Sequence, residues 1–193
     1  MSTLTVANLQ GTPASGNIIT VPTGHTLRSA TTGGIYIPGS VLQVVSNTMT
    51  ATFSGATGTT PIAVTGLSVT ITPRFATSKI VVFGQMFGNG TSAQSQLFAY
   101  LYKNGTIINT GVTAGASQLA NCIGRYYFAD GAVSGTIPFS WQDLPATTSA
   151  TTYQIYVSGE TSTTLYVNRT QNDGATANAA RTPSVITAME IGV

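Results

Sequence analysis

Hydrophobic and polar residues alternate with a period of two along most of the chain beyond residue 40. Leu67, Val69 and Ile71 alternate with serine and threonine, a pattern typical of a strand with one buried face. Hydrophobic spacing of three to four residues is almost absent, and residues 175–180 form the one short window of helical composition. We therefore predict an all-β protein.

Turn signals divide this pattern into about eight to ten strands. Asn104-Gly105 lies between two β-prone runs and predicts a tight hairpin, because both residues tolerate a positive φ. Pro73 ends one run, since proline cannot donate to a strand ladder. The nearly continuous apolar run from Lys79 to Phe87 predicts a strand buried on both faces. The predicted strands cover residues 41–53, 67–72, 79–87, 97–102, 106–108, 117–128, 135–141, 152–158, 164–168 and 184–191.

The number and spacing of these strands predict an antiparallel jelly-roll β-sandwich over residues 39–193, closed by its last strand. Residues 1–38 have a different pattern, in which apolar pieces of three or four residues are cut by glycine and proline. Pieces this short cannot build a core of their own. We predict an N-terminal attachment arm or short β shaft at 1–38, with a flexible arm as the alternative.

Charge is scarce for a soluble protein. Charged residues make up 6% of the chain, against about 25% in an average soluble domain. Solubility normally depends on dispersed surface charge, so two arrangements are open. The side faces are buried against identical subunits, or the surface is hydrated through hydroxyls and amides. Both arrangements fit components of particles and fibres, and we expect self-assembly.

The same scarcity bears on partners. Seven Lys and Arg are spread singly along the chain and give a net charge of +2, without the cation clusters that nucleic-acid binding requires. We expect no nucleic-acid partner and no binding to anionic membranes. No stretch approaches the roughly 20 apolar residues of a membrane span, and we expect neither membrane insertion nor a secretory signal. Cys122 is the single cysteine, so no disulfide forms within one chain.

Groups capable of catalysis are few and scattered. His25 is the single histidine and lies in the glycine- and proline-rich arm, while Cys122 falls in an apolar predicted strand. Asp130 and Asp173 precede glycine in turn sequences, which their local backbone hydrogen bonds explain. Metal sites need grouped ligands, and none are grouped in the sequence. We expect no enzymatic activity, no cofactor and no metal site.

The candidates for receptor binding are the aromatic residues Tyr126, Tyr127 and Trp141. Strand alternation places at least one ring of Tyr126-Tyr127-Phe128 outside its sheet, where it would meet a neighbouring subunit or a ligand; a core position is the third alternative. Trp141 stands two residues before Asp143, a combination found in carbohydrate sites, although a core tryptophan at a strand end is the favoured interpretation. Candidate binding loops are residues 88–96, 110–115, 129–135 and 168–180.

Several segments together resemble small fibre and virion proteins of tailed bacteriophages, notably those infecting cyanobacteria. The segments that carry the resemblance are Val41-Leu42-Gln43-Val44-Val45-Ser46, Val64-Thr65-Gly66-Leu67-Ser68-Val69-Thr70-Ile71-Thr72-Pro73, Ser78-Lys79-Ile80-Val81-Val82 and Ile186-Thr187-Ala188-Met189-Glu190-Ile191. In the arm, Ser2-Thr3-Leu4-Thr5-Val6 with Gln10 and Ile18-Ile19-Thr20-Val21-Pro22-Thr23-Gly24-His25-Thr26-Leu27 are similar to N-terminal shaft segments of those proteins.

This resemblance implies a homotrimeric virion protein, located on the phage tail or capsid surface, with a jelly-roll head. It implies attachment to other virion proteins through the N-terminal arm and a host surface glycan or protein as the outer partner. A short trimeric fibre that binds the host is the leading hypothesis. A capsid decoration or head-fibre protein anchored by its arm is the alternative, and a small polysaccharide depolymerase is a third.

Overall fold

The computed structural model describes residues 13, 16, 19–27, 36–91, 95–109, 111–112, 121–128, 134–160, 162–174 and 179–193. The chain divides into two units, residues 1–35 and Tyr36–Val193. Within the described part of the second unit every regular element is a β-strand, so the prediction of an all-β fold is confirmed. Residues 175–178 of the short window with helical composition lie outside the described residues, and 179–180 are not helical.

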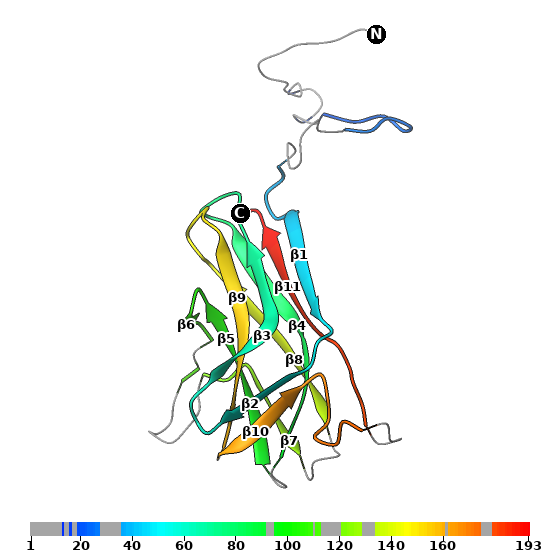
Figure 1. Ribbon diagram of the computed structural model, residues 1–193. Coiled ribbons are helices and arrows are strands. Elements are labelled where there is room, and N and C mark those ends of the chain that lie inside the picture. The colour runs from blue at the N-terminus through cyan, green and yellow to red at the C-terminus, as the bar shows by residue number, and fades with distance from the viewer. Residues whose placement is uncertain are drawn as a thin grey trace. The chain divides into compact units, whose positions relative to one another are not determined.

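Eleven antiparallel strands form two sheets (Figure 1). Sheet A contains β1 (Val41–Met49), β2 (Phe53–Thr57), β4 (Lys79–Gly90), β8 (Gly135–Asp143), β10 (Thr163–Val167) and β11 (Ser184–Ile191). Sheet B contains β3 (Ile62–Ile71), β5 (Ser95–Lys103), β6 (Thr106–Ile107), β7 (Gly124–Phe128) and β9 (Thr151–Gly159).

The strand order is that of a jelly roll. In sheet A, β11 lies between β1 and β4, and β8 pairs with the other edge of β4. In sheet B, β9 lies between β3 and β5, and β7 pairs with the other edge of β5. The short strand β10 pairs with the end of β4, beyond the part of β4 that pairs with β11, and β2 pairs with β10. Sheet A is thereby extended past the ends of β1 and β11. The chain ends in a strand of sheet A, β11, as predicted.

The core lies between the sheets and consists of the side chains that period-two alternation turns inward. Leu67, Val69 and Ile71 on β3 are each at most 3% exposed, which confirms the alternation read from the sequence. On β5, Leu97 and Leu101 are fully buried in the core. Burial of each such side chain stabilises the fold by about 1.5–3 kcal/mol relative to an exposed position.

The hairpin predicted at Asn104-Gly105 is present between β5 and β6. Asn104 has φ 48° and Gly105 has φ 81°, so both occupy the left-handed region that this turn requires. The Asn104 side chain also accepts a hydrogen bond from the backbone N–H of Thr152 (2.9 Å) and joins the hairpin to the start of β9.

Two strand predictions need correction. The run from Lys79 to Phe87 is not buried on both faces: Ile80 and Val82 point into the core, but Phe83 is 39% exposed because no described segment covers the outer face of sheet A there. The strand predicted at 117–128 begins only at Gly124, and residues 113–120 lie outside the described part. Cys122 therefore precedes the strand and is partly exposed.

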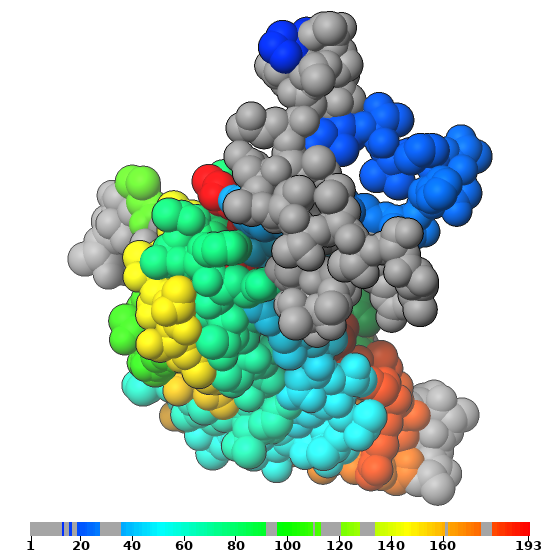
Figure 2. All heavy atoms as spheres, turned by 90° about the horizontal axis from the view of Figure 1, so that it is seen from above, coloured from blue at the N-terminus to red at the C-terminus, as the bar shows by residue number. Residues whose placement is uncertain are grey.

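The two sheets are joined along the edge where β1 meets β3, seen as adjoining cyan and green surfaces in Figure 2. The Asn47 side chain on β1 donates to the carbonyl oxygens of Gly66 (2.9 Å) and Ser68 (2.8 Å). The Gln43 side chain donates to the Thr72 carbonyl (2.6 Å) and to the buried carboxylate of Glu190 (2.5 Å). These bonds use backbone groups that an edge strand would otherwise offer to another chain.

Candidate functional site

The sandwich has two distinct ends, and the strand registers define them. At the first end Val41 pairs with Ile191, and the Gly39 N–H donates to the Gly192 carbonyl (2.7 Å). The Tyr36 hydroxyl donates to the Val193 carbonyl (2.5 Å), so the entry into the head and its C-terminus lie together. At the opposite end β2, β4, β7 and β9 finish, and β10 begins and ends near it. We call this second end the distal end (Figure 1).

Three of the four candidate loops have their flanking strands at the distal end: 88–96, 129–135 and 168–180. The candidate loop 110–115 does not. Its described flanks are attached to the side of β5, where the Ile108 N–H donates to the Leu101 carbonyl (3.1 Å) and the Ile123 N–H donates to the Ala99 carbonyl (2.7 Å). Most of each loop tip lies outside the described residues, except in the segment after β10.

The predicted aromatic residues do not form one surface. Tyr126 and Trp141 pack against the core from sheet B and sheet A, whereas Tyr127 is 54% exposed on the outer face of sheet B. Gly135 allows the Tyr126 ring to approach, since a Cβ there would overlap the ring. Tyr127 is thus the candidate of these three that an outside partner could reach.

Asp143, the acidic residue near Trp141, is held by the protein itself. Its carboxylate accepts hydrogen bonds from Lys103 Nζ (3.0 and 3.1 Å) and from the Tyr153 hydroxyl (2.7 Å). Burial, with the adjoining Asp143 carboxylate, raises the pKa of Tyr153 far above its usual value. The cluster links β5, β8 and β9 and has a structural role.

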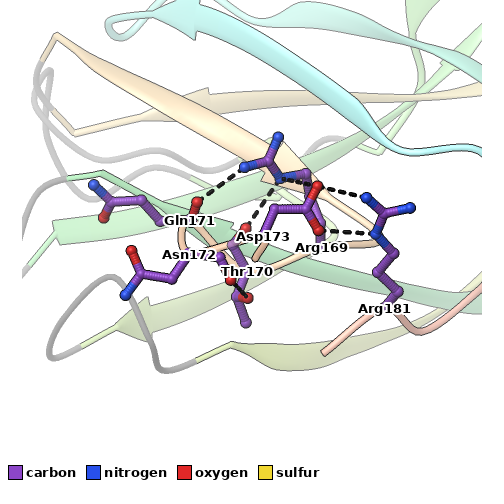
Figure 3. Close-up of polar contacts among 6 residues, drawn as sticks. All are labelled: Arg169, Thr170, Gln171, Asn172, Asp173 and Arg181. Carbon is purple, nitrogen blue, oxygen red and sulfur yellow. Dashed lines mark hydrogen bonds and ion pairs between the residues drawn. The ribbon is translucent and has the colours of Figure 1, made fainter. Parts of the chain in front are cut away.

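The loop after β10 is organised by a cluster of charges that sequence reasoning did not single out (Figure 3). Both nitrogens of the Arg181 fork donate to the Asp173 carboxylate (2.7 and 2.8 Å). Arg169 lies 3.5 Å from the same carboxylate and stacks over the Tyr166 ring at 4.6 Å. The hydrogen bond from Arg181, together with the positive charge of both arginines, lowers the pKa of Asp173. This charge cluster closes the loop on itself.

Asn168 anchors the beginning of the same loop and was also missed. It is 1% exposed, and its side-chain NH2 donates to the carbonyl oxygens of Met49 (2.7 Å) and Ala51 (2.9 Å). Its side-chain oxygen accepts from the Ser184 hydroxyl (2.5 Å), which in turn accepts from the Phe87 N–H (3.0 Å). The available signal was an asparagine at the end of a predicted strand, because asparagine tolerates the left-handed φ of 62° found there better than most residues.

His25 lies in the first unit of the chain and Cys122 in the second. His25 is exposed and closes a turn, in which its N–H donates to the Pro22 carbonyl (3.0 Å) and Gly24 has φ 83°. Among the described residues no three His, Cys, Asp or Glu side chains gather as a metal site would require. Over the same residues no helix is long and apolar enough to cross a membrane.

No family model matches the chain, and no curated protein matches it. The solved structures that the chain matches include proteins of infectious bursal disease virus. The Gx strain structure gives a TM-score of 0.38 at 18% identity, over 78% of this chain and 38% of that chain. The T=1 particles derived from the same virus give 0.41 at 15% identity, over 87% and 41%. The chain therefore spans about two-fifths of these proteins. Neither of these two structures is of a tailed-phage protein, and at these scores they carry no functional argument.

Proposed function

We propose that this protein is a structural component of a tailed-phage virion: a short trimeric fibre whose jelly-roll head binds the host surface. One observation carries the proposal. The chain enters the head beside its C-terminus, while the strand ends that bear most of the candidate loops lie at the other end. A head attached to a particle through the segment before Tyr36 would hold its distal end outward, where a host surface can be reached.

The outer face of sheet A supports a trimer. The registers align Val44, Met189 and Val81 in one row across β1, β11 and β4, next to the partly exposed Phe83. Lys79 is the one ionisable side chain on the outward positions of β1, β4, β8 and β11. Neutral Ser, Thr and Gln side chains share this face with the apolar row, and the cores of contacts between subunits are poor in charged residues. Packing this face against a copy would also account for the low charge of the chain.

A capsid decoration or head-fibre protein anchored by its N-terminal arm is the second candidate. The separation of the entry into the head from the distal loops fits this function equally well. The depolymerase hypothesis gains no support from the described carboxylates. Asp143 is held by Lys103 and Tyr153, Asp173 by two arginines, and Glu190 is fully buried. The fourth described carboxylate, Glu160, is exposed, but the paired acids of a glycosidase need a second one beside it.

Imaging and adsorption separate the two candidates. Phage particles carrying an epitope tag at the exposed Thr148, in the connection between β8 and β9, would be labelled with gold-conjugated antibody and imaged by electron microscopy. Label at the tail, together with adsorption of the purified protein to host cells, is expected. Label distributed over the capsid, without adsorption, would refute the fibre hypothesis in favour of the capsid decoration protein.

A further inference from the structure

A hollow at the distal end of the sandwich is lined by small side chains, most of which carry a hydroxyl. Three strand ends form it: the end of β2 with Thr57 and Gly58, the residue after β4, Thr91, and the start of β10 with Ser162, Thr163 and Thr164. Its volume is about 530 Å³, and it is a shallow site that stands largely open to solvent.

The wall of the hollow is fixed by hydrogen bonds between these segments. The Thr91 N–H donates to the Thr164 carbonyl (3.0 Å), and the Thr164 N–H donates to Thr91 Oγ1 (3.1 Å). Thr91 Oγ1 also lies 3.1 Å from Thr163 Oγ1. The Gly159 N–H donates to the Gly58 carbonyl (2.9 Å). The hydroxyl groups that a ligand would contact are therefore positioned by strands of the sandwich and not by a single loop.

The chemistry of the wall selects a neutral, hydroxyl-rich ligand. Its polar side chains are threonine and serine hydroxyls, which both donate and accept hydrogen bonds, as sugar hydroxyls require. No ionisable side chain is among its described lining residues, so a charged ligand would lose hydration there without gaining a counter-charge. The hydroxyls of Ser162 and Thr164 have no hydrogen-bond partner among the described residues and remain available to a ligand.

We propose that this hydroxyl-lined hollow binds a neutral sugar unit of a host surface glycan. The inference rests on the proposed function, since it names the ligand class of the same distal end. No aromatic ring is among the described residues that line the hollow, so we expect a single site to bind weakly. Simultaneous engagement of three copies in a trimer raises the overall affinity by avidity.

Gly58 allows a direct test, because a side chain there enters the hollow without backbone strain. Its φ is not in the left-handed region, and the nearest atom to an added Cβ is Ser162 Oγ at 4.0 Å. The Gly58→Tyr variant fills the hollow. The Thr148→Tyr variant adds a similar ring at an exposed position of the opposite end and serves as the matched control. Ser162→Ala removes one hydroxyl and provides a second variant if Gly58→Tyr does not fold, as judged by circular dichroism and thermal melting.

Saturation-transfer NMR with glucose, galactose, mannose and N-acetylglucosamine measures sugar binding to the full chain. We expect transfer to at least one sugar with the wild-type protein and with Thr148→Tyr, and none with Gly58→Tyr. Ser162→Ala should weaken binding about two- to tenfold, the range that one hydrogen bond is worth. No transfer to any of the four sugars, or transfer that survives Gly58→Tyr, would overturn the proposal.

Adsorption of the purified protein to host cells separates this inference from the proposed function. If Gly58→Tyr adsorbs as well as the wild type, the hollow is not the receptor site, while the fibre function stands. Adsorption that survives periodate oxidation of cell-surface sugars indicates a protein receptor and also overturns the glycan assignment. Sugar binding by a wild-type protein that does not adsorb would refute the fibre and leave the hollow as a sugar site.

Discussion

Replacing Asn168 should strongly destabilise the head, because this one polar side chain joins three separate segments. It links the segment after β1, the start of β11 and, through Ser184, the end of β4. Asn168→Gly removes the side chain and keeps the left-handed backbone at no steric cost. Asn168→Ala removes the same hydrogen bonds and adds the strain of an alanine at φ 62°.

The magnitude follows from the bonds lost. Each of the three side-chain hydrogen bonds contributes about 1 kcal/mol net, and a carbonyl left buried without a partner costs about 1–3 kcal/mol. We expect Asn168→Gly to lower the free energy of unfolding by about 3–5 kcal/mol. Asn168→Ala should lower it by about a further 1 kcal/mol.

Urea unfolding followed by tryptophan fluorescence and circular dichroism measures both variants. The protein concentration is kept constant, because assembly contributes to the apparent stability of an oligomer. The midpoint should shift while the slope with denaturant stays the same. A loss below about 1 kcal/mol for Asn168→Gly would refute the hydrogen-bond argument, and equal losses for the two variants would refute the strain argument.

Three further predictions concern the core, the loop and assembly. An added Cβ at Gly84 would overlap the carbonyl oxygen of Val185, so Gly84→Ala should lower the free energy of unfolding by more than about 3 kcal/mol. Gly58→Ala should change it by no more than about 0.5 kcal/mol, and thermal melting compares the two variants. The lowered pKa of Asp173 stabilises the loop above the ordinary carboxyl pKa, and this contribution is lost as the pH falls through the lower folded value. The protection of amides in residues 169–174, relative to their intrinsic exchange rates, should therefore fall in acid, and Asp173→Asn should show low protection even at neutral pH; protection unchanged down to pH of about 2 would contradict this. If the proposed trimer forms through this face, the wild type should sediment as a trimer at micromolar concentration and Phe83→Asp as a monomer. A trimeric variant would exclude this face as the contact.

The fold was predictable from the sequence to the extent that local pattern decides it. Alternation on β3 and the Asn104-Gly105 turn depend on neighbours in sequence, and the structure confirms them. The exposure of Phe83 was not predictable, because it depends on whether another layer covers the outer face of sheet A. The sequence of a central strand shows the same apolar run whether its outer face is covered by another layer of the same chain or by another subunit.

The candidate site was predictable only in outline. Three of the four predicted loops lie at one end of the sandwich, as the registers show, but the residues that shape that end were missed. Asn168 and Asp173 read as ordinary turn residues, and their partners lie far along the chain or depend on the path of the loop. Threonine and serine are so common in this sequence that their grouping at Thr57, Thr91 and Ser162 appears only in three dimensions.

The few charges of the head are mostly used within the chain, and this determines how it can meet a partner. Lys103 pairs with Asp143, and two arginines share Asp173. The Glu190 carboxylate accepts a hydrogen bond from the backbone N–H of Arg74 (2.7 Å). Charged side chains outside these pairs, such as Arg74, Lys79 and Arg125, are few, so we expect contacts outside the chain to depend mainly on shape, apolar area and neutral hydrogen bonds, none of which is screened by salt. Electrostatic steering, in contrast, weakens steeply as salt is added. We therefore expect adsorption of the purified protein to host cells to change less than about twofold between low salt and about 0.5 M sodium chloride. A tenfold fall over that range would show that charges other than these paired ones carry the attachment.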